Sequence, residues 1–108
     1  MIDLTDFIGP SIVARDIEYK GKTKTFHFRE LSADAVEKLF MGLDSDPKKN
    51  KGLRNRIIAQ GVATEDGENA FTEAEAGALP NELANLLQSA SFDVNGLGKK
   101  GAEDAKNE

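Results

Sequence analysis

Residues 62–98 constrain the fold most, because they hold a turn, a helix start, an apolar stripe and a helix end in succession. Asp66-Gly67 is typical of a turn, and Thr72 with Glu75 fits a capping box, in which two side chains satisfy free backbone N–H groups at a helix start. A longer helix is expected next, and its apolar residues fall on one stripe: Leu79, Leu83, Leu86, Leu87, Ala90 and Val94. Asn95-Gly96 should end this helix, because glycine readily adopts the left-handed conformation found after helices.

Alternating apolar and polar residues predict a β-hairpin ahead of this run. The expected strands are residues 11–19 and 24–29, with residues 20–23 as the turn. Pairing Ile17 with Phe26 puts the larger apolar side chains on one face: Val13, Ile17, Tyr19, Phe26 and Phe28. A register slip of one residue would scatter that set, so we expect this pairing.

Helical spacing marks two more segments between the hairpin and the turn. Ser32 is placed to cap a helix that begins near Ala33 and stops before Asp44-Ser45-Asp46-Pro47, where proline disfavours a helical residue ahead of it. Its core-facing residues would be Val36, Leu39, Phe40 and Leu43. The next segment holds Leu53, Ile57, Ile58 and Val62, which we interpret as helical, although Ile57-Ile58 and Val62 would also suit a buried strand.

These elements predict an α+β fold, with an N-terminal β-hairpin followed by three or four packed helices. Residues 1–98 would form a single α+β domain. Residues 99–108 hold no apolar side chain larger than alanine, so we expect a flexible C-terminal tail there.

Composition narrows the classes of function. The chain has 108 residues, 39% of them hydrophobic, which predicts one modest and mostly aliphatic core. Its net charge of −5 disfavours nucleic-acid binding, because contact with phosphates needs a cationic face. It lacks cysteine, which excludes disulfides and zinc–thiolate sites. Without a basic N-terminal region or a long apolar run, the chain is expected to be soluble, with neither a signal peptide nor membrane contact.

Three patterns imitate functional motifs, and we interpret each as structural. The glycines at Gly96, Gly98 and Gly101 match the dinucleotide fingerprint, but they follow a helix where the fingerprint requires a strand. Residues 64–73 resemble part of a calcium loop, but Val62 occupies the position of the first carboxylate ligand. Asp16, placed opposite His27, would be an exposed cross-strand pair. We therefore expect no catalytic residue, no cofactor and no metal, and hence no enzyme.

Exposed basic and apolar residues are the candidates for partner binding. The basic stretch consists of Lys48, Lys49, Lys51, Arg54 and Arg56, and it would be either a solvated loop or a docking patch for an acidic partner or RNA. Phe92 lies opposite the leucine stripe, so either the helix ends before it or its ring faces outward towards a partner. Leu97 would extend that apolar patch.

The order Asp66-Gly67, Phe71-Thr72, a short acidic helix, a leucine-striped helix and residues 95–98 resembles the tail assembly chaperones of long-tailed (siphovirus, lambda-like) bacteriophages. The match runs from Leu53 to the C-terminus and more weakly over the hairpin. The resemblance implies a small protein of the host cytoplasm that binds the tape measure protein, self-associates and is absent from the mature virion. The alternative is a small acidic protein-binding regulator with no catalytic activity.

The resemblance also implies a second, longer product made by a translational frameshift, whose extension recruits the major tail (tube) protein. Lysine codons are rich in adenine. The codons for Gly98-Lys99-Lys100 or Ala105-Lys106-Asn107 could therefore contain a run of adenines on which the ribosome shifts its reading frame. A client segment and an oligomeric state do not follow from the sequence.

Overall fold

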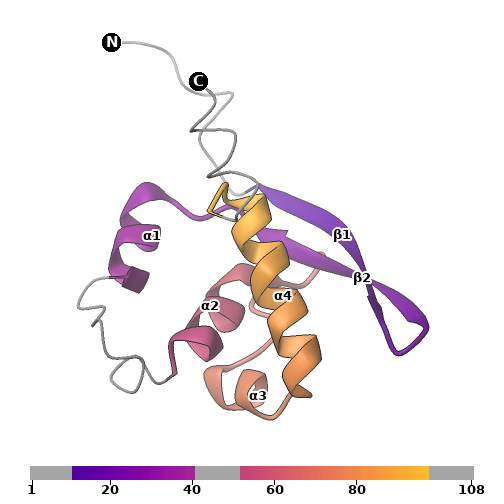
Figure 1. Cartoon of the computed structure of the whole chain (residues 1–108). Helices are drawn as coiled ribbons and strands as arrows, with labels where there is room; N and C mark the ends of the chain where they lie inside the picture. Colours follow the sequence, from indigo (N-terminus) through magenta and orange to yellow (C-terminus); the bar gives the residue numbers. More distant parts are fainter. Residues whose placement is uncertain (1–10, 41–51, 98–108) are drawn as a thin grey trace, which may run out of the picture.

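The computed structural model describes residues 11–40 and 52–97, and within them it has the predicted α+β class (Figure 1). A hairpin, β1 (Ile12–Tyr19) and β2 (Lys22–Arg29), is followed by α1 (Ala33–Phe40) and α2 (Leu53–Gly61). The short strand β3 (Val62–Ala63) follows, then α3 (Glu73–Gly77) and α4 (Asn81–Val94). The first ten residues, Leu43 with the loop after it, and the predicted tail lie outside the described residues.

The turn of the hairpin is shorter than predicted, and this changes the strand register. Lys20 and Gly21 alone connect the strands, with φ of 53° and 76°, as a type I′ turn requires. Ile17 therefore lies opposite Lys24, and Phe26 lies opposite Arg15. The predicted pairing of Ile17 with Phe26 is wrong by two residues. The predicted apolar face survives, because side chains alternate with a period of two and an even shift keeps each on its side.

The predicted pair of Asp16 and His27 is also wrong, for the same reason. Asp16 lies opposite Thr25, whose hydroxyl donates a hydrogen bond of 2.6 Å to the Asp16 carboxylate. His27 lies opposite Ala14 on one side and pairs with Ala63 of β3 on the other. The histidine is thus in the middle strand of the sheet, whose order is β1-β2-β3.

Helix α1 starts as predicted, and α2 resolves the ambiguity of its segment. The Ser32 hydroxyl accepts a hydrogen bond of 3.1 Å from the backbone N–H of Ala35. Ile57 and Ile58 are helical, whereas Val62 leaves the helix at once and pairs with Phe28. The chain therefore passes from helix to strand without a loop, which buries both isoleucines and Val62.

The predicted turn and helix ends between residues 62 and 97 are confirmed. Gly67 has φ of 89°, and its N–H donates to the Thr64 carbonyl at 2.9 Å. Thr72 and Glu75 form both bonds of the capping box. After α4, the N–H of Leu97 donates to the Phe92 carbonyl at 2.7 Å, and that of Gly96 to the Asp93 carbonyl at 3.2 Å. With φ of 69° at Gly96, this is a Schellman motif.

The core lies where α4 and α2 pack on the apolar face of the hairpin (Figure 1). Its buried residues are Phe28, Ile58, Val62, Ala76, Ala84 and Leu87. Leu83, Ala90 and Val94 pack against this cluster as the stripe predicts, but Leu86 is 39% exposed. The buried face of α4 is centred on Ala84, Leu87 and Ser91, so Leu86 falls beyond its edge.

Arg54 joins the start of α2 to the start of α4, and the two helices approach closely at Gly61. A Cβ atom at Gly61 would lie 3.2 Å from the Cβ of Ser91 and still closer to its hydroxyl oxygen. Ser91 is 2% exposed and lies in the packed contact between the two helices. Glycine at this position allows the two helices to touch.

Candidate partner-binding surfaces

The described part of the basic stretch lies on α2, and one of its two arginines has a structural role. The Arg54 guanidinium donates hydrogen bonds to the side-chain oxygens of Asn81 at 2.8 Å and Asn85 at 3.0 Å. Arg54 thereby ties the start of α2 to the first half of α4. Lys48, Lys49 and Lys51 lie outside the described residues.

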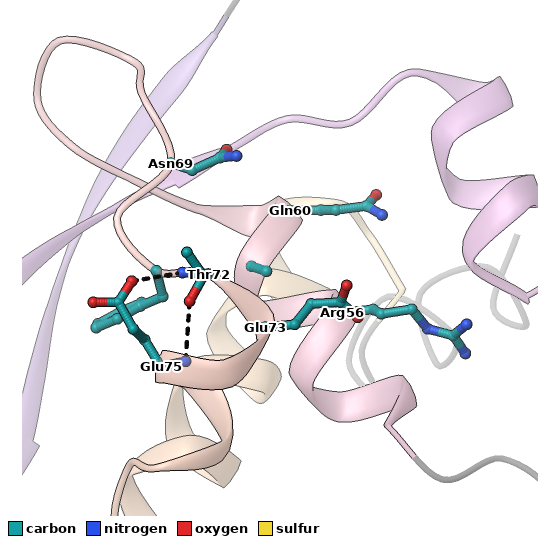
Figure 2. A pocket seen from close by; sticks show the side chains of 8 residues that line it. Arg56, Gln60, Asn69, Thr72, Glu73 and Glu75 are labelled. Atoms are coloured by element: carbon teal, nitrogen blue, oxygen red, sulfur yellow. Dashed lines mark hydrogen bonds between the residues drawn. The ribbon is translucent and has the colours of Figure 1, made fainter.

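Arg56 is exposed and borders a pocket of about 300 Å³ between α2 and the start of α3 (Figure 2). The pocket is lined by Arg56, Ala59, Gln60, Asn69, Phe71, Thr72, Glu73 and Glu75. Figure 2 shows that Thr72 and Glu75 bond to each other's backbone, while the Arg56 side chain extends away from them. Two of the polar groups in the lining are thus committed to the cap of α3.

Phe92 and Leu97 are brought together by the Schellman motif. Helix α4 continues through Phe92 to Val94, so the alternative in which the helix ends before Phe92 is wrong. Phe92 is half-buried, and Leu97 is 41% exposed. The hydrogen bond between their backbones holds these two apolar residues at the same end of α4.

Arg54 and the apolar pair of Phe92 and Leu97 lie towards opposite ends of α4. Arg54 contacts Asn81 and Asn85, whereas Phe92 begins roughly 10 Å further along α4 at 1.5 Å per residue. Arg54 therefore does not join Phe92 and Leu97 in one compact patch. If these three residues contact one partner, the contact follows the length of α4.

Leu86 is an exposed apolar residue, although the leucine stripe predicts that it lies in the core. It borders a shallow hollow of about 310 Å³ on the outer side of α4, together with Glu82, Asn85 and Ser89. The buried face of α4 includes Ala84 and Ser91 but not Leu86. Small residues carry a weak apolar signal, so the true centre of the buried face was not evident from the leucines alone.

Arg29 and Asn95 join distant segments, and no sequence pattern predicted these long-range contacts, although Asn95 was expected at the helix end. Arg29 donates to the carbonyls of Gln60 and Gly67, each at 2.7 Å, and to the Asn69 side chain at 3.0 Å. Asn95 accepts from the Leu31 N–H at 2.7 Å and donates to the Arg29 carbonyl at 3.2 Å. These residues support the fold around the candidate surfaces.

No group of three or more histidine, aspartate or glutamate side chains that could hold a metal ion occurs in residues 11–40 and 52–97. No helix in the same part of the chain is long and apolar enough to cross a membrane. No protein-family model, curated protein or solved structure matches the chain. The family resemblance therefore stays a hypothesis.

Proposed function

We propose that this chain is a tail assembly chaperone of a long-tailed bacteriophage, which binds the tape measure protein in the host cytoplasm and is not an enzyme. The resemblance that motivates the proposal rests on residues 53–97. In that stretch Thr72 and Glu75 cap α3, Gly67 completes a turn and Gly96 ends α4. The side chains of Thr72 and Glu75 are used for helix capping. This agrees with a protein that functions by binding a partner and not by catalysis.

The observation that carries the proposal is the pair of exposed leucines on α4 and at its end. Leu86 is 39% exposed and Leu97 is 41% exposed, whereas Leu87 between them is fully buried. Leu86 also borders a hollow. Exposed apolar side chains beside a concave surface are typical of protein-binding sites. We infer that the client lies along the outer side of α4 and that Phe92 contributes at its end.

Co-expression with the tape measure protein of the same phage tests this function. The tagged full-length chain should co-purify with that protein and keep it out of inclusion bodies. Leu86→Asp and Leu97→Asp should each reduce the recovered client by about tenfold or more, because a carboxylate would be buried against an apolar partner. Ala74→Asp is the matched control, since Ala74 is exposed in the first turn of α3, where an acid is tolerated.

Circular dichroism of each variant separates lost binding from lost folding. Failure of the wild-type chain to co-purify with the tape measure protein would refute the chaperone function. Stoichiometric co-purification with a different host or phage protein would favour the regulator. Retained client binding in a folded Leu86→Asp, Leu97→Asp double variant would leave the function standing but place its surface elsewhere.

We further propose that a frameshift near the codons for Gly98-Lys99-Lys100 or Ala105-Lys106-Asn107 produces a longer chain that recruits the major tail (tube) protein. The nucleotide sequence should then show a heptameric slippery site there and an overlapping open frame. Mass spectrometry of infected cells should detect peptides that cross the junction. A message without such a site would refute the two-product mechanism and leave tape measure binding untouched.

A further inference from the structure

The outer part of the hairpin separates its charges by face. We call residues 15–26 the hairpin arm. The observed register puts Arg15, Lys22 and Lys24 on the face that also carries Ile17, Tyr19 and Phe26. Asp16 and Glu18 lie on the opposite face with two threonines. All three cations and both acids are exposed. The chain as a whole has a net charge of −5, so this local positive face is not a consequence of composition.

We call the face that carries Arg15, Lys22 and Lys24 the cationic face. It begins where the hydrophobic core ends. Ile17 and Phe26 still pack against the core cluster, and the strands then continue to the turn beyond α4 (Figure 1). Lys20 at the turn places its ammonium group 5.3 Å from the centre of the Tyr19 ring, and Lys24 lies 5.8 Å from that of Phe26. The face therefore offers half-buried apolar surface beneath a layer of ammonium groups.

We propose that the cationic face of the hairpin arm binds an acidic segment of a partner protein that carries apolar residues among its carboxylates. Such a segment would pair its carboxylates with Arg15, Lys22 and Lys24 and place its apolar side chains against Ile17 and Tyr19. The charge complementarity steers association and selects the partner. This inference goes beyond the proposed function, because it concerns a different surface from α4 and a partner defined by its charge.

A nucleic acid fits this face less well. Bases bind such surfaces by stacking on open aromatic rings, but lysines already lie over both Tyr19 and Phe26. The acids Asp16 and Glu18 on the reverse face would also repel a polyanion that wraps around the arm.

Protection of an open strand edge does not explain the arrangement by itself. Lysines on edge strands do prevent edge-to-edge pairing. That role would be served equally by cations on either face, or by acids and bases in alternation. Here the two signs lie on opposite faces over the whole arm, which favours an oriented contact.

Fluorescence anisotropy with the full-length chain tests the proposal. The probe is a labelled 20-residue peptide of glutamate with leucine at every fourth position. Wild type should bind it, and binding should weaken as salt is raised from 50 to 300 mM, because exposed charges are screened. Lys22→Glu should weaken binding by about fivefold, and Lys22→Glu with Lys24→Glu by more than about twentyfold. Lys38→Glu is the control for one reversal, since Lys38 is exposed on α1, and it should change affinity by less than about twofold.

The outcomes are distinct. No binding by wild type, or equal losses in Lys22→Glu and Lys38→Glu, would overturn the proposal, because the face would then have no special role. Tighter binding to the oligonucleotide dT20, lost in Lys22→Glu, would make it a nucleic-acid site and overturn the protein partner. A two-dimensional amide spectrum of each variant confirms that the hairpin remains folded. None of these measurements uses the tape measure protein, so they succeed or fail separately from the chaperone test.

Discussion

Arg29 is a single side chain that joins β2, the end of α2 and the turn before α3. Its guanidinium donates to two backbone carbonyls and one side-chain amide. We expect Arg29→Met to lower the free energy of unfolding by about 1–3 kcal/mol, because it keeps the apolar stem but leaves the Gln60 and Gly67 carbonyls without this donor. Urea denaturation followed by circular dichroism measures the change.

Arg15→Met is the matched control for that variant, because Arg15 is exposed on β1. It should stay within about 0.5 kcal/mol of wild type, the usual range for surface changes. Equal midpoints for the two variants would show that the Arg29 hydrogen bonds contribute nothing to stability.

Which single-residue roles could be predicted depends on how far apart the partners lie in the chain. The Ser32 cap, the Thr72–Glu75 box and the Gly96 helix end each involve residues within a few positions, so local pattern was sufficient. Arg29 bonds to residues 31 to 40 positions away. Asn95 reaches back 64 residues to Leu31. No local pattern marks such pairs, so the sequence predicted the place of Asn95 at a helix end but not its bond to Leu31, and it predicted no bond of Arg29.

At the scale of the elements, the hairpin turn contains a residue whose type does not suit its backbone conformation. Lys20 adopts φ of 53°, which is unfavourable for a residue with a side chain, whereas asparagine tolerates it. Lys20→Asn should therefore raise the free energy of unfolding by about 0.5–1 kcal/mol. Lys22→Asn, the same replacement two residues later within β2, should lower it slightly, since asparagine is disfavoured in strands.

Thermal unfolding of the two variants checks this expectation. A destabilised Lys20→Asn chain would contradict the two-residue turn. Cross-strand nuclear Overhauser contacts between Ile17 and Lys24 would verify the register directly.

The hairpin also shows which features of a sheet an alternating sequence pattern can predict. Alternation identified both strands and the inward face, because those depend only on whether a residue is odd or even. It did not determine the register, because a four-residue and a two-residue turn place the same residues inward. The basic stretch at residues 48–56 was noticed because its charges are adjacent in sequence. The cations Lys22 and Lys24 were not noticed, although their spacing of two predicts that they share one face of a strand.

At the scale of the whole molecule, the contact of Gly61 with Ser91 sets how closely α2 and α4 approach. We expect Gly61→Ala to destabilise the fold by about 1–3 kcal/mol, as for other overpacked cores, because the added methyl group meets the Ser91 side chain. Adding Ser91→Ala should recover part of the loss, since it removes the nearest atom. A double-mutant cycle in urea measures this coupling.

Ser89→Ala is the control for the serine replacement, since Ser89 is exposed on the same helix, and it should not rescue Gly61→Ala. Additive effects of Gly61→Ala and Ser91→Ala would mean that the two helices do not touch at this point.

Because α4 covers the hairpin, the order of synthesis affects how the nascent chain folds. Phe28 is synthesised roughly sixty residues before Ala84 and Leu87, with which it shares the core. At ordinary elongation rates the apolar face of the hairpin therefore stays uncovered by α4 for about 3 to 12 seconds. The codons for all described residues end with that of Leu97. The proposed change of reading frame lies at or after the next codon, so both products would carry the same folded domain and differ only in the residues added after it.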